Sequence, residues 1–113
     1  MVEDDSVLRK ALKSLLEENG YGTCCLEDFS NVEEEILRAG PDMVLLDILL
    51  PGTNGQEILR NLRQKSQIPG IMVTSREGDM DQILAMSYGA DDYITKPYNP
   101  TLLLLKMEAL FRR

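Results

Sequence analysis

The chain has 113 residues, of which 43% are hydrophobic, so it is long enough for one domain around a single core. Its formal net charge of −7 disfavours nucleic-acid binding by the chain itself and suits basic partners or divalent cations, although solubility alone explains the charge equally well. No apolar stretch approaches the roughly 20 residues that span a bilayer, and no signal-peptide pattern is present, so we expect a cytoplasmic location and no membrane partner.

A short first strand is predicted ahead of the acids Glu3 and Asp4. Only Met1 and Val2 precede these acids, so the sequence indicates an N-terminally truncated chain. Shortening a strand removes ladder hydrogen bonds and buried contacts, so we expect lower stability than for a chain with a full first strand. Asp5 is the expected N-cap of the helix that follows.

Helices and strands then alternate along the chain. Residues 7–16 have apolar side chains at helical spacing, and Asn19-Gly20 ends that helix. Cys24 and Cys25 lie in the next strand, where adjacent side chains point to opposite faces, so no disulfide between them is expected. Four later helices are expected to have their N-caps at Asn31, Asn54, Asp79 and Asn99. The strands after the first are predicted over residues 22–26, 42–47, 70–74 and 91–95.

This order of elements predicts an α/β fold. Strands that alternate with helices of about 10 to 15 residues form a parallel sheet with helices on both faces. Right-handed crossovers restrict such a chain to doubly wound arrangements. Ligands of these folds bind in the crevice beyond the carboxyl ends of the strands, so the residues at those ends are the candidate site.

Five side chains with compatible chemistry lie at these strand ends: Glu3, Asp4, Asp47, Thr74 and Lys96. Two carboxylates about 4 Å apart repel each other by roughly 4 kcal/mol at an effective dielectric of 20, and a hard divalent cation relieves that repulsion. The hydroxyl and the ammonium can bind phosphoryl oxygens. Together the five side chains predict a site for a metal ion and a phosphoryl group. Taken singly, Asp47 could be a solvated strand end, Thr74 an ordinary strand residue and Lys96 a surface lysine.

The same positions lie within motifs of a known family. The strings are Glu3-Asp4-Asp5, Leu45-Leu46-Asp47, Leu50-Pro51-Gly52 with Gly55, Val73-Thr74-Ser75 and Gly89-Ala90-Asp91-Asp92-Tyr93-Ile94-Thr95-Lys96-Pro97. Over essentially its whole length, residues 1–113, the chain resembles a single receiver domain of two-component response regulators. The last string is most similar to the winged-helix DNA-binding subfamily, the OmpR/PhoB type. The resemblance implies a flavodoxin-like (CheY-like) fold, a five-stranded parallel sheet in the order 2-1-3-4-5 with five helices.

The resemblance implies that Asp47 is the phosphoacceptor. The donor would be a phosphohistidine on a partner histidine kinase, since this chain contains no histidine. Asp4 and Asp47 would bind Mg²⁺ together with the backbone carbonyl of Leu49, and Glu3 would act directly or through a water. Such a protein is no enzyme beyond catalysing its own phosphotransfer and dephosphorylation.

The resemblance also implies a conformational switch. Thr74 and Lys96 would bind the phosphoryl group, Thr74 would move toward it, and Tyr93 would turn inward behind Thr74. The affected face would comprise the fourth helix, the last strand and the fifth helix. It would control an output, such as transcription regulation by a DNA-binding domain outside this chain. The family also has a cis peptide bond at the position of Lys96-Pro97.

The same face forms homodimers in that subfamily through ion pairs between subunits. Its charged positions are matched by Asp91, Asp92, Lys106 and Arg113. Gln82 and Leu102 stand where an opposite-charge pair is usual, so one pair of a homodimer is expected to be missing. The run Leu102–Leu105 predicts an exposed apolar patch, a common feature of interfaces.

Several alternatives are compatible with the sequence. A stand-alone receiver would act by docking to another protein, and a pseudo-receiver would bind partners without being phosphorylated. A Mg²⁺-dependent phosphatase usually has a second aspartate two residues after its nucleophile, where this chain has Leu49. A flavin carrier of similar fold would have a Ser/Thr-rich phosphate loop after the first strand, and none is evident. The end at Arg112-Arg113, where a linker begins in the subfamily, suggests an excised receiver.

Overall fold

The structure is a computed structural model and describes residues 1–3, 5–26, 28–50, 52–74 and 89–112. The helix predicted to begin at Asp79 lies outside these residues. So do other residues that the sequence analysis named, namely Asp4, Pro51, Ser75, Gln82 and Arg113.

Within the described residues the chain forms four helices and five strands. The helices are α1 (Ser6–Glu18), α2 (Val32–Ala39), α3 (Gly55–Arg63) and α5 (Pro100–Phe111). The strands are β1 (Val44–Leu46), β2 (Leu49–Leu50), β3 (Thr53–Asn54), β4 (Gly70–Thr74) and β5 (Asp92–Thr95). The predicted strands at 42–47, 70–74 and 91–95 are therefore present as β1, β4 and β5. No described helix is long and apolar enough to span a bilayer.

The main sheet is parallel and has the strand order β1-β4-β5. Leu46 of β1 is paired with Met72 of β4, which in turn is paired with Tyr93 of β5. On the other side of β1, Val2 forms a parallel bridge to Leu46. The short first strand of the sequence analysis, Met1 and Val2, thus lies beside β1. The observed order, from Val2 through β1 and β4 to β5, corresponds to strands 1-3-4-5 of the expected order 2-1-3-4-5.

The prediction of a regular strand over residues 22–26 is wrong, although the segment runs beside the first strand. The Met1 amino group donates to the Cys24 carbonyl at 2.8 Å, and the Leu26 N–H donates to the Met1 carbonyl at 3.1 Å. Only Met1 and Val2 lie alongside the segment, and two residues provide too few backbone partners for a regular ladder. Cys24 and Cys25 are both free thiols.

An antiparallel hairpin that the sequence analysis did not predict lies between β1 and α3. It consists of β2 and β3, with Leu50 paired to Thr53. Gly52 adopts a φ of 70° in the connecting turn, a backbone conformation that favours glycine. The hairpin directs the chain back toward the end of β1, where α3 begins.

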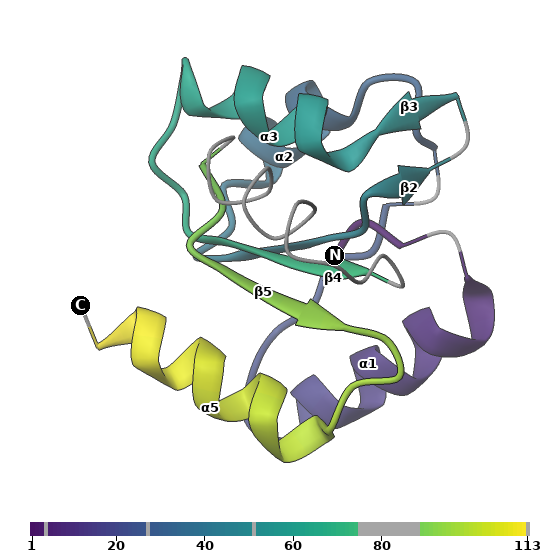
Figure 1. Cartoon of the computed structure of the whole chain (residues 1–113), viewed down its shortest axis with the longest axis vertical. Helices are drawn as coiled ribbons and strands as arrows, with labels where there is room; N and C mark the ends of the chain where they lie inside the picture. Colours follow the sequence, from purple (N-terminus) through teal and green to yellow (C-terminus); the bar gives the residue numbers. More distant parts are fainter. Residues whose placement is uncertain (4, 27, 51, 75–88, 113) are drawn as a thin grey trace.

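Helices cover both faces of the sheet, as predicted. Figure 1 shows α2 and α3 on one side of the main sheet and α1 and α5 on the other. Ile36 and Leu62 are buried on the first side, and Leu12 and Leu103 on the second. Val7 was predicted to face the core but is 77% exposed. It precedes Leu12 by five residues, which is about 140° around a helix.

Side-chain caps begin three of the four described helices. Asp5, Asn54 and Asn99 each accept hydrogen bonds from two backbone N–H groups in the first turns of α1, α3 and α5. Asn31 occupies the N-cap position of α2, but its side chain makes no capping hydrogen bond. These caps fix where α1 and α3 start, directly beside the carboxyl edge of the sheet.

Candidate functional site

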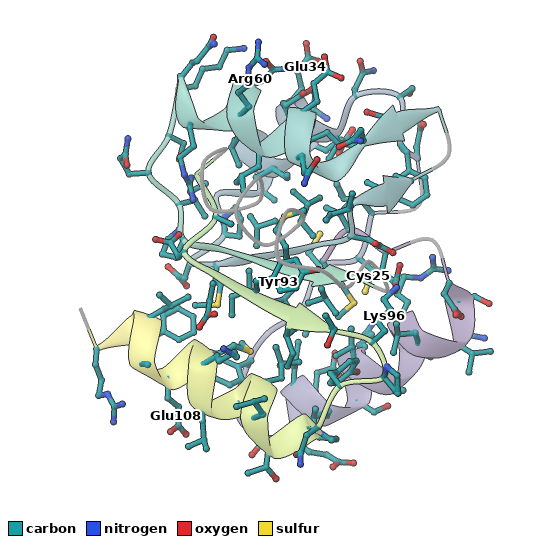
Figure 2. The ribbon with its side chains drawn as sticks, viewed as in Figure 1. Cys25, Glu34, Arg60, Tyr93, Lys96 and Glu108 are labelled. Carbon is teal, nitrogen blue, oxygen red and sulfur yellow. The ribbon has the colours of Figure 1, made fainter. Side chains whose placement is uncertain are left out.

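The carboxyl edge of the sheet brings side chains from three segments together. Asp47 follows β1, Glu3 follows the Val2 bridge beside it, and Lys96 follows β5. The Asp47 N–H donates to the Val2 carbonyl at 3.0 Å, which fixes the two acidic segments side by side. Figure 2 shows Lys96 just beyond the arrowhead of β5. Three of the five residues singled out from the sequence therefore meet at this edge.

Lys96 joins the two acids. Its Nζ donates to Asp47 Oδ2 at 2.8 Å and also to Glu3 Oε1. Only 3% of Glu3 and 6% of Asp47 are exposed, so both carboxylates are shielded from water. Buried charges are tolerated only when they are paired, and the ammonium provides that pairing. The peptide bond between Lys96 and Pro97 is cis, as the resemblance implied.

Burial and the neighbouring charges shift the pKa values of Glu3 and Lys96. Burial raises the pKa of Glu3 to about 7, with further upward contributions from Asp47 and an opposing one from Lys96. For Lys96, burial works to lower the pKa, but the hydrogen bonds to Asp47 and Glu3 outweigh burial and raise it. Lys96 therefore remains an ammonium, while Glu3 exchanges its proton near neutral pH.

Three further residues lie at or near the cluster: Gly55, which the sequence analysis quoted as a motif residue without a structural role, and Arg9 and Tyr98, which it did not single out. A Cβ on Gly55 would lie 1.9 Å from the Asp47 carbonyl oxygen, so glycine is needed where α3 meets the end of β1. Arg9 Nη1 donates to the Glu3 carbonyl at 3.1 Å. Burial and the charge of Glu3 raise the pKa of Tyr98. The Asn-Gly pair at a helix start was a usable signal for Gly55, whereas Arg9 and Tyr98 had none.

The remaining predicted residues are placed through their backbones or lie elsewhere. Thr74 is the last residue of β4 and is paired with β5, so its backbone reaches the same edge. Leu49 begins β2. Tyr93 in β5 is half-buried and packs against the core on the α2 and α3 side (Figure 2). Asp4 is outside the described residues.

The acids are suited to a hard divalent cation. Glu3 Oε2 is buried and has no hydrogen-bond partner in the described part of the chain, so one carboxylate oxygen is available to a ligand. Carboxylate and backbone carbonyl oxygens are the donors that Mg²⁺ prefers. No group of three or more metal-binding side chains occurs within the described ranges, which do not include Asp4. The donors at this edge therefore fit Mg²⁺ in type.

Three charged positions that the resemblance assigned to subunit contacts, Asp91, Asp92 and Lys106, are paired inside this chain. Asp92 Oδ1 lies 2.9 Å from Lys106 Nζ, and Asp91 Oδ2 lies 3.2 Å from an Arg63 nitrogen. The first pair connects β5 to α5, and the second connects Asp91, the residue just before β5, to α3. Both acids therefore stabilise the folded chain itself.

The apolar patch predicted on α5 is smaller than the run of four leucines. Leu102 and Leu105 are 46% and 55% exposed, respectively. Leu103 is completely buried against the sheet. Residues three apart share a face of a helix, which puts Leu102 and Leu105 together on the outer side.

A parallel α/β sheet with two buried acids and a lysine at its carboxyl edge places this chain among the doubly wound α/β proteins, whose ligand crevice lies beyond the strand ends. The sequence profile of the response regulator receiver domain matches residues 1–108 of this chain. The chain belongs to the response regulator receiver domain family.

Curated relatives agree with this assignment. The chain is 40% identical over 113 residues to the sensory transduction protein RegX3 of Mycobacterium tuberculosis (strain CDC 1551 / Oshkosh). It is also 40% identical over 113 residues to the response regulator protein GraR of Staphylococcus epidermidis (strain ATCC 12228 / FDA PCI 1200). Each match covers 100% of this chain and 50% of the relative. The chain thus spans about half the length of the curated relatives it matches.

Solved structures are similar over the whole fold. The BeF3-activated N-terminal receiver domain of Klebsiella pneumoniae RstA has a TM-score of 0.93 and 37% identity, with 99% of this chain and 96% of that chain covered. The N-terminal domain of the nisin resistance regulator NsrR has a TM-score of 0.86 and 36% identity, with 96% and 92% covered. The overall receiver fold is therefore confirmed. Receiver domains as a family are phosphoacceptor switches that interact with histidine kinases and generally use Mg²⁺.

Proposed function

We propose that Asp47 is the phosphoacceptor of this receiver domain and that Lys96 and Glu3 are its immediate partners. The observation that carries the proposal is the buried cluster in which Lys96 Nζ lies 2.8 Å from Asp47 Oδ2 and also contacts Glu3. An acceptor carboxylate needs a fixed position and a nearby positive charge. Asp47 has both, at the strand end where this type of sheet binds ligands.

The proposed transfer requires little covalent help from the protein. One Asp47 oxygen bonds to phosphorus while the bond from phosphorus to the donor's nitrogen or oxygen breaks, and the leaving atom keeps the electron pair. Positioning and charge neutralisation account for most of the catalysis in such reactions. Lys96 neutralises charge on the phosphoryl oxygens, and we assign the Thr74 hydroxyl as a second donor to them.

The residues that we assign to Mg²⁺ are Glu3, Asp4, Asp47 and the backbone carbonyl of Leu49. The bound cation supplies positive charge that offsets the repulsion between the acids and the incoming phosphoryl oxygens. Glu3 must lose its proton to serve as a ligand. Because burial raises the pKa of Glu3 to about 7, cation binding releases protons near neutral pH.

The consequence of phosphorylation that we propose is a switch through Thr74 and Tyr93. A phosphoryl group adds about −1.5 to −2 charges to the site, which is enough to bias a two-state arrangement. Thr74 moves toward that charge, and Tyr93, which is half-buried beside the α2–α3 core, turns further inward. The face formed by the helix predicted after β4, by β5 and by α5 then changes its partners.

The wider setting follows from the family. We propose a single receiver domain over residues 1–113, located in the cytoplasm, that takes its phosphoryl group from a histidine kinase. Its output is transcription regulation through a DNA-binding domain outside this chain. The face formed by the helix predicted after β4, by β5 and by α5 is its candidate homodimer surface. The alternatives are a stand-alone receiver that docks to a protein and a pseudo-receiver that is never phosphorylated.

Incubation with acetyl phosphate and Mg²⁺, followed by intact-mass measurement, tests this proposal. We expect the parent chain to gain one phosphoryl group, the Asp47→Asn variant to gain none, and EDTA to prevent the gain. Asp42→Asn is the matched control. Asp42 is an exposed acid ahead of β1, so its replacement is expected to leave phosphorylation unchanged. A parent chain that stays unmodified while its circular dichroism shows a folded protein would favour the pseudo-receiver.

A further inference from the structure

Arg9 connects the helix α1 to the acidic segment that ends the first strand. It lies near the start of α1, is half-buried, and its Nη1 donates to the backbone carbonyl of Glu3 at 3.1 Å. Side chains of a helix lean toward its amino end, so Arg9 reaches back toward the carboxyl edge of the sheet, where α1 begins. Arg9 has no role in the phosphoryl transfer proposed above.

The backbone on either side of Glu3 is held by other contacts. The Val2 N–H donates to a β1 carbonyl at 2.8 Å, and the Val2 carbonyl accepts from the Asp47 N–H at 3.0 Å. Asp5 accepts from two backbone N–H groups of α1, which fixes where that helix starts. The Arg9 contact is the only hydrogen bond that the Glu3 carbonyl accepts within the described part of the chain. Because the preceding residue is fixed too, this contact sets the direction of the Glu3 side chain.

The Glu3 carboxylate is the part of the site that this contact positions. Its Oε1 accepts from Lys96 Nζ, and its Oε2 is buried with no hydrogen-bond partner in the described ranges. Distances between a cation and its ligands are set within about 0.2 Å. A turn of the backbone at Glu3 would therefore misplace Oε2 as a ligand, and the hydrogen bond from Arg9 opposes that turn.

Arg9 acts on Glu3 through position rather than through charge. Its guanidinium bonds to the backbone carbonyl, and no ion pair joins it to a carboxylate among the residues that the structure describes. Apart from burial, the groups that shift the pKa of Glu3 are Asp47 and Lys96. Removing a positive charge near an acidic site tightens the binding of a divalent cation, whereas removing a positioning contact weakens it. The two roles therefore predict effects of opposite sign.

We propose that Arg9 is a positioning residue of the cation site, which holds the Glu3 carboxylate in place as a Mg²⁺ ligand by bonding to the Glu3 backbone. The inference rests on the proposed function, in which Glu3 is one of the ligands. Partners that orient a metal ligand typically contribute about 10- to 100-fold to metal affinity. Because Arg9 bonds to the backbone and not to the carboxylate itself, we expect an effect at the lower end of that range.

Titration with Mn²⁺ at pH 8, with the free ion measured by electron paramagnetic resonance, tests the proposal. Mn²⁺ takes the same oxygen ligands as Mg²⁺, and Glu3, whose pKa is about 7, is mostly ionised at this pH. We expect Arg9→Met to bind Mn²⁺ about tenfold more weakly than the parent chain. Arg9→Lys, whose ammonium can donate to the same carbonyl, should recover part of the loss. Lys10→Met is the matched control, because Lys10 is the adjacent exposed cation of α1, and it should bind Mn²⁺ at least as tightly as the parent.

A double-mutant cycle tests whether Arg9 acts through Glu3. In the Glu3→Gln background, Arg9→Met should cause no further loss of Mn²⁺ affinity, because the carboxylate that Arg9 positions is absent. Circular dichroism checks the fold of each variant, and Arg9→Gln replaces Arg9→Met if the latter is unfolded. Equal Mn²⁺ affinities of Arg9→Met and Lys10→Met, or the same loss from Arg9→Met in both backgrounds, would overturn the inference and leave the proposed function intact. A folded parent chain that binds no Mn²⁺ would overturn both.

Discussion

Replacement of Lys96 by methionine tests how much the Lys96 ammonium stabilises the fold by pairing with the buried Glu3 and Asp47 carboxylates. The substitution keeps a flexible side chain of similar length but leaves the Glu3 and Asp47 carboxylates, whose side chains are 4% and 7% exposed, facing each other without a cation. Two like charges about 4 Å apart repel by roughly 4 kcal/mol at an effective dielectric of 20. Breaking a buried ion pair from one side typically costs about 3 to 5 kcal/mol.

We therefore expect Lys96→Met to lower the free energy of unfolding by about 3 kcal/mol at pH 8 in EDTA. The cost should shrink at pH 5.5, because Glu3, whose pKa is already raised to about 7, takes up a proton and its charge repulsion with Asp47 is removed. Saturating Mg²⁺ at pH 8 should also reduce the cost, since a cation that binds only the folded state stabilises it. Urea denaturation followed by circular dichroism measures all three effects.

The matched control is Lys106→Met, which removes the ion pair between α5 and β5. That pair is more exposed, with 24% of the Lys106 and 35% of the Asp92 side chain accessible, so its loss should cost at most about 1 kcal/mol at either pH. Equal losses in the two variants at pH 8, or a Lys96→Met loss that does not depend on pH, would refute the reasoning about the buried acids.

Further consequences can be checked with the same unfolding assay. The folded-state pKa of Glu3 is about 7 against an ordinary 4.5, so its protonation stabilises the fold below pH 4.5 and this contribution is lost as pH rises through 7. In EDTA, Glu3→Gln should remove up to about 3 kcal/mol of this loss of unfolding free energy with rising pH. An unchanged pH dependence of stability would contradict the raised pKa of Glu3. Gly55→Ala should cost about 2 kcal/mol, because its Cβ would lie 1.9 Å from a carbonyl oxygen. Gly22→Ala, with open space around its Cβ, should cost less than half as much. Asp5→Ala should cost about 1 kcal/mol through loss of the α1 cap, and no change would mean that Ser6 substitutes for it.

Local sequence rules predicted the helices and the central strands well. Asp5, Asn54 and Asn99 were identified as caps because short polar side chains at those positions satisfy free backbone N–H groups. The run that became β4 is apolar, the run that became β5 contains aromatic and β-branched residues, and both are bounded by breakers, so their strand character depends little on context. The segment 22–26 differs, because it can form a regular strand only beside a neighbouring strand of sufficient length. Met1 and Val2 are too short to serve as that neighbour.

The candidate site was predictable in its position but not in its electrostatics. Strand ends in a parallel sheet meet at one edge, so the proximity of Asp47 and Lys96 follows from chain topology. The contact of Lys96 with both acids and the raised pKa of Glu3 depend on burial and on side-chain conformation, which no spacing rule encodes. Likewise, the space that requires Gly55 exists only once α3 packs against the end of β1.

The central claim is that Asp47 itself receives the phosphoryl group. The most direct test is to treat the chain with acetyl phosphate and Mg²⁺, digest it at low temperature, and locate the modified residue by tandem mass spectrometry. The account predicts a single phosphoryl group on the peptide that contains Asp47 and no modification of any other acid. A phosphoryl group found on Glu3, Asp4 or a surface acid, with Asp47 unmodified in a folded chain, would contradict it.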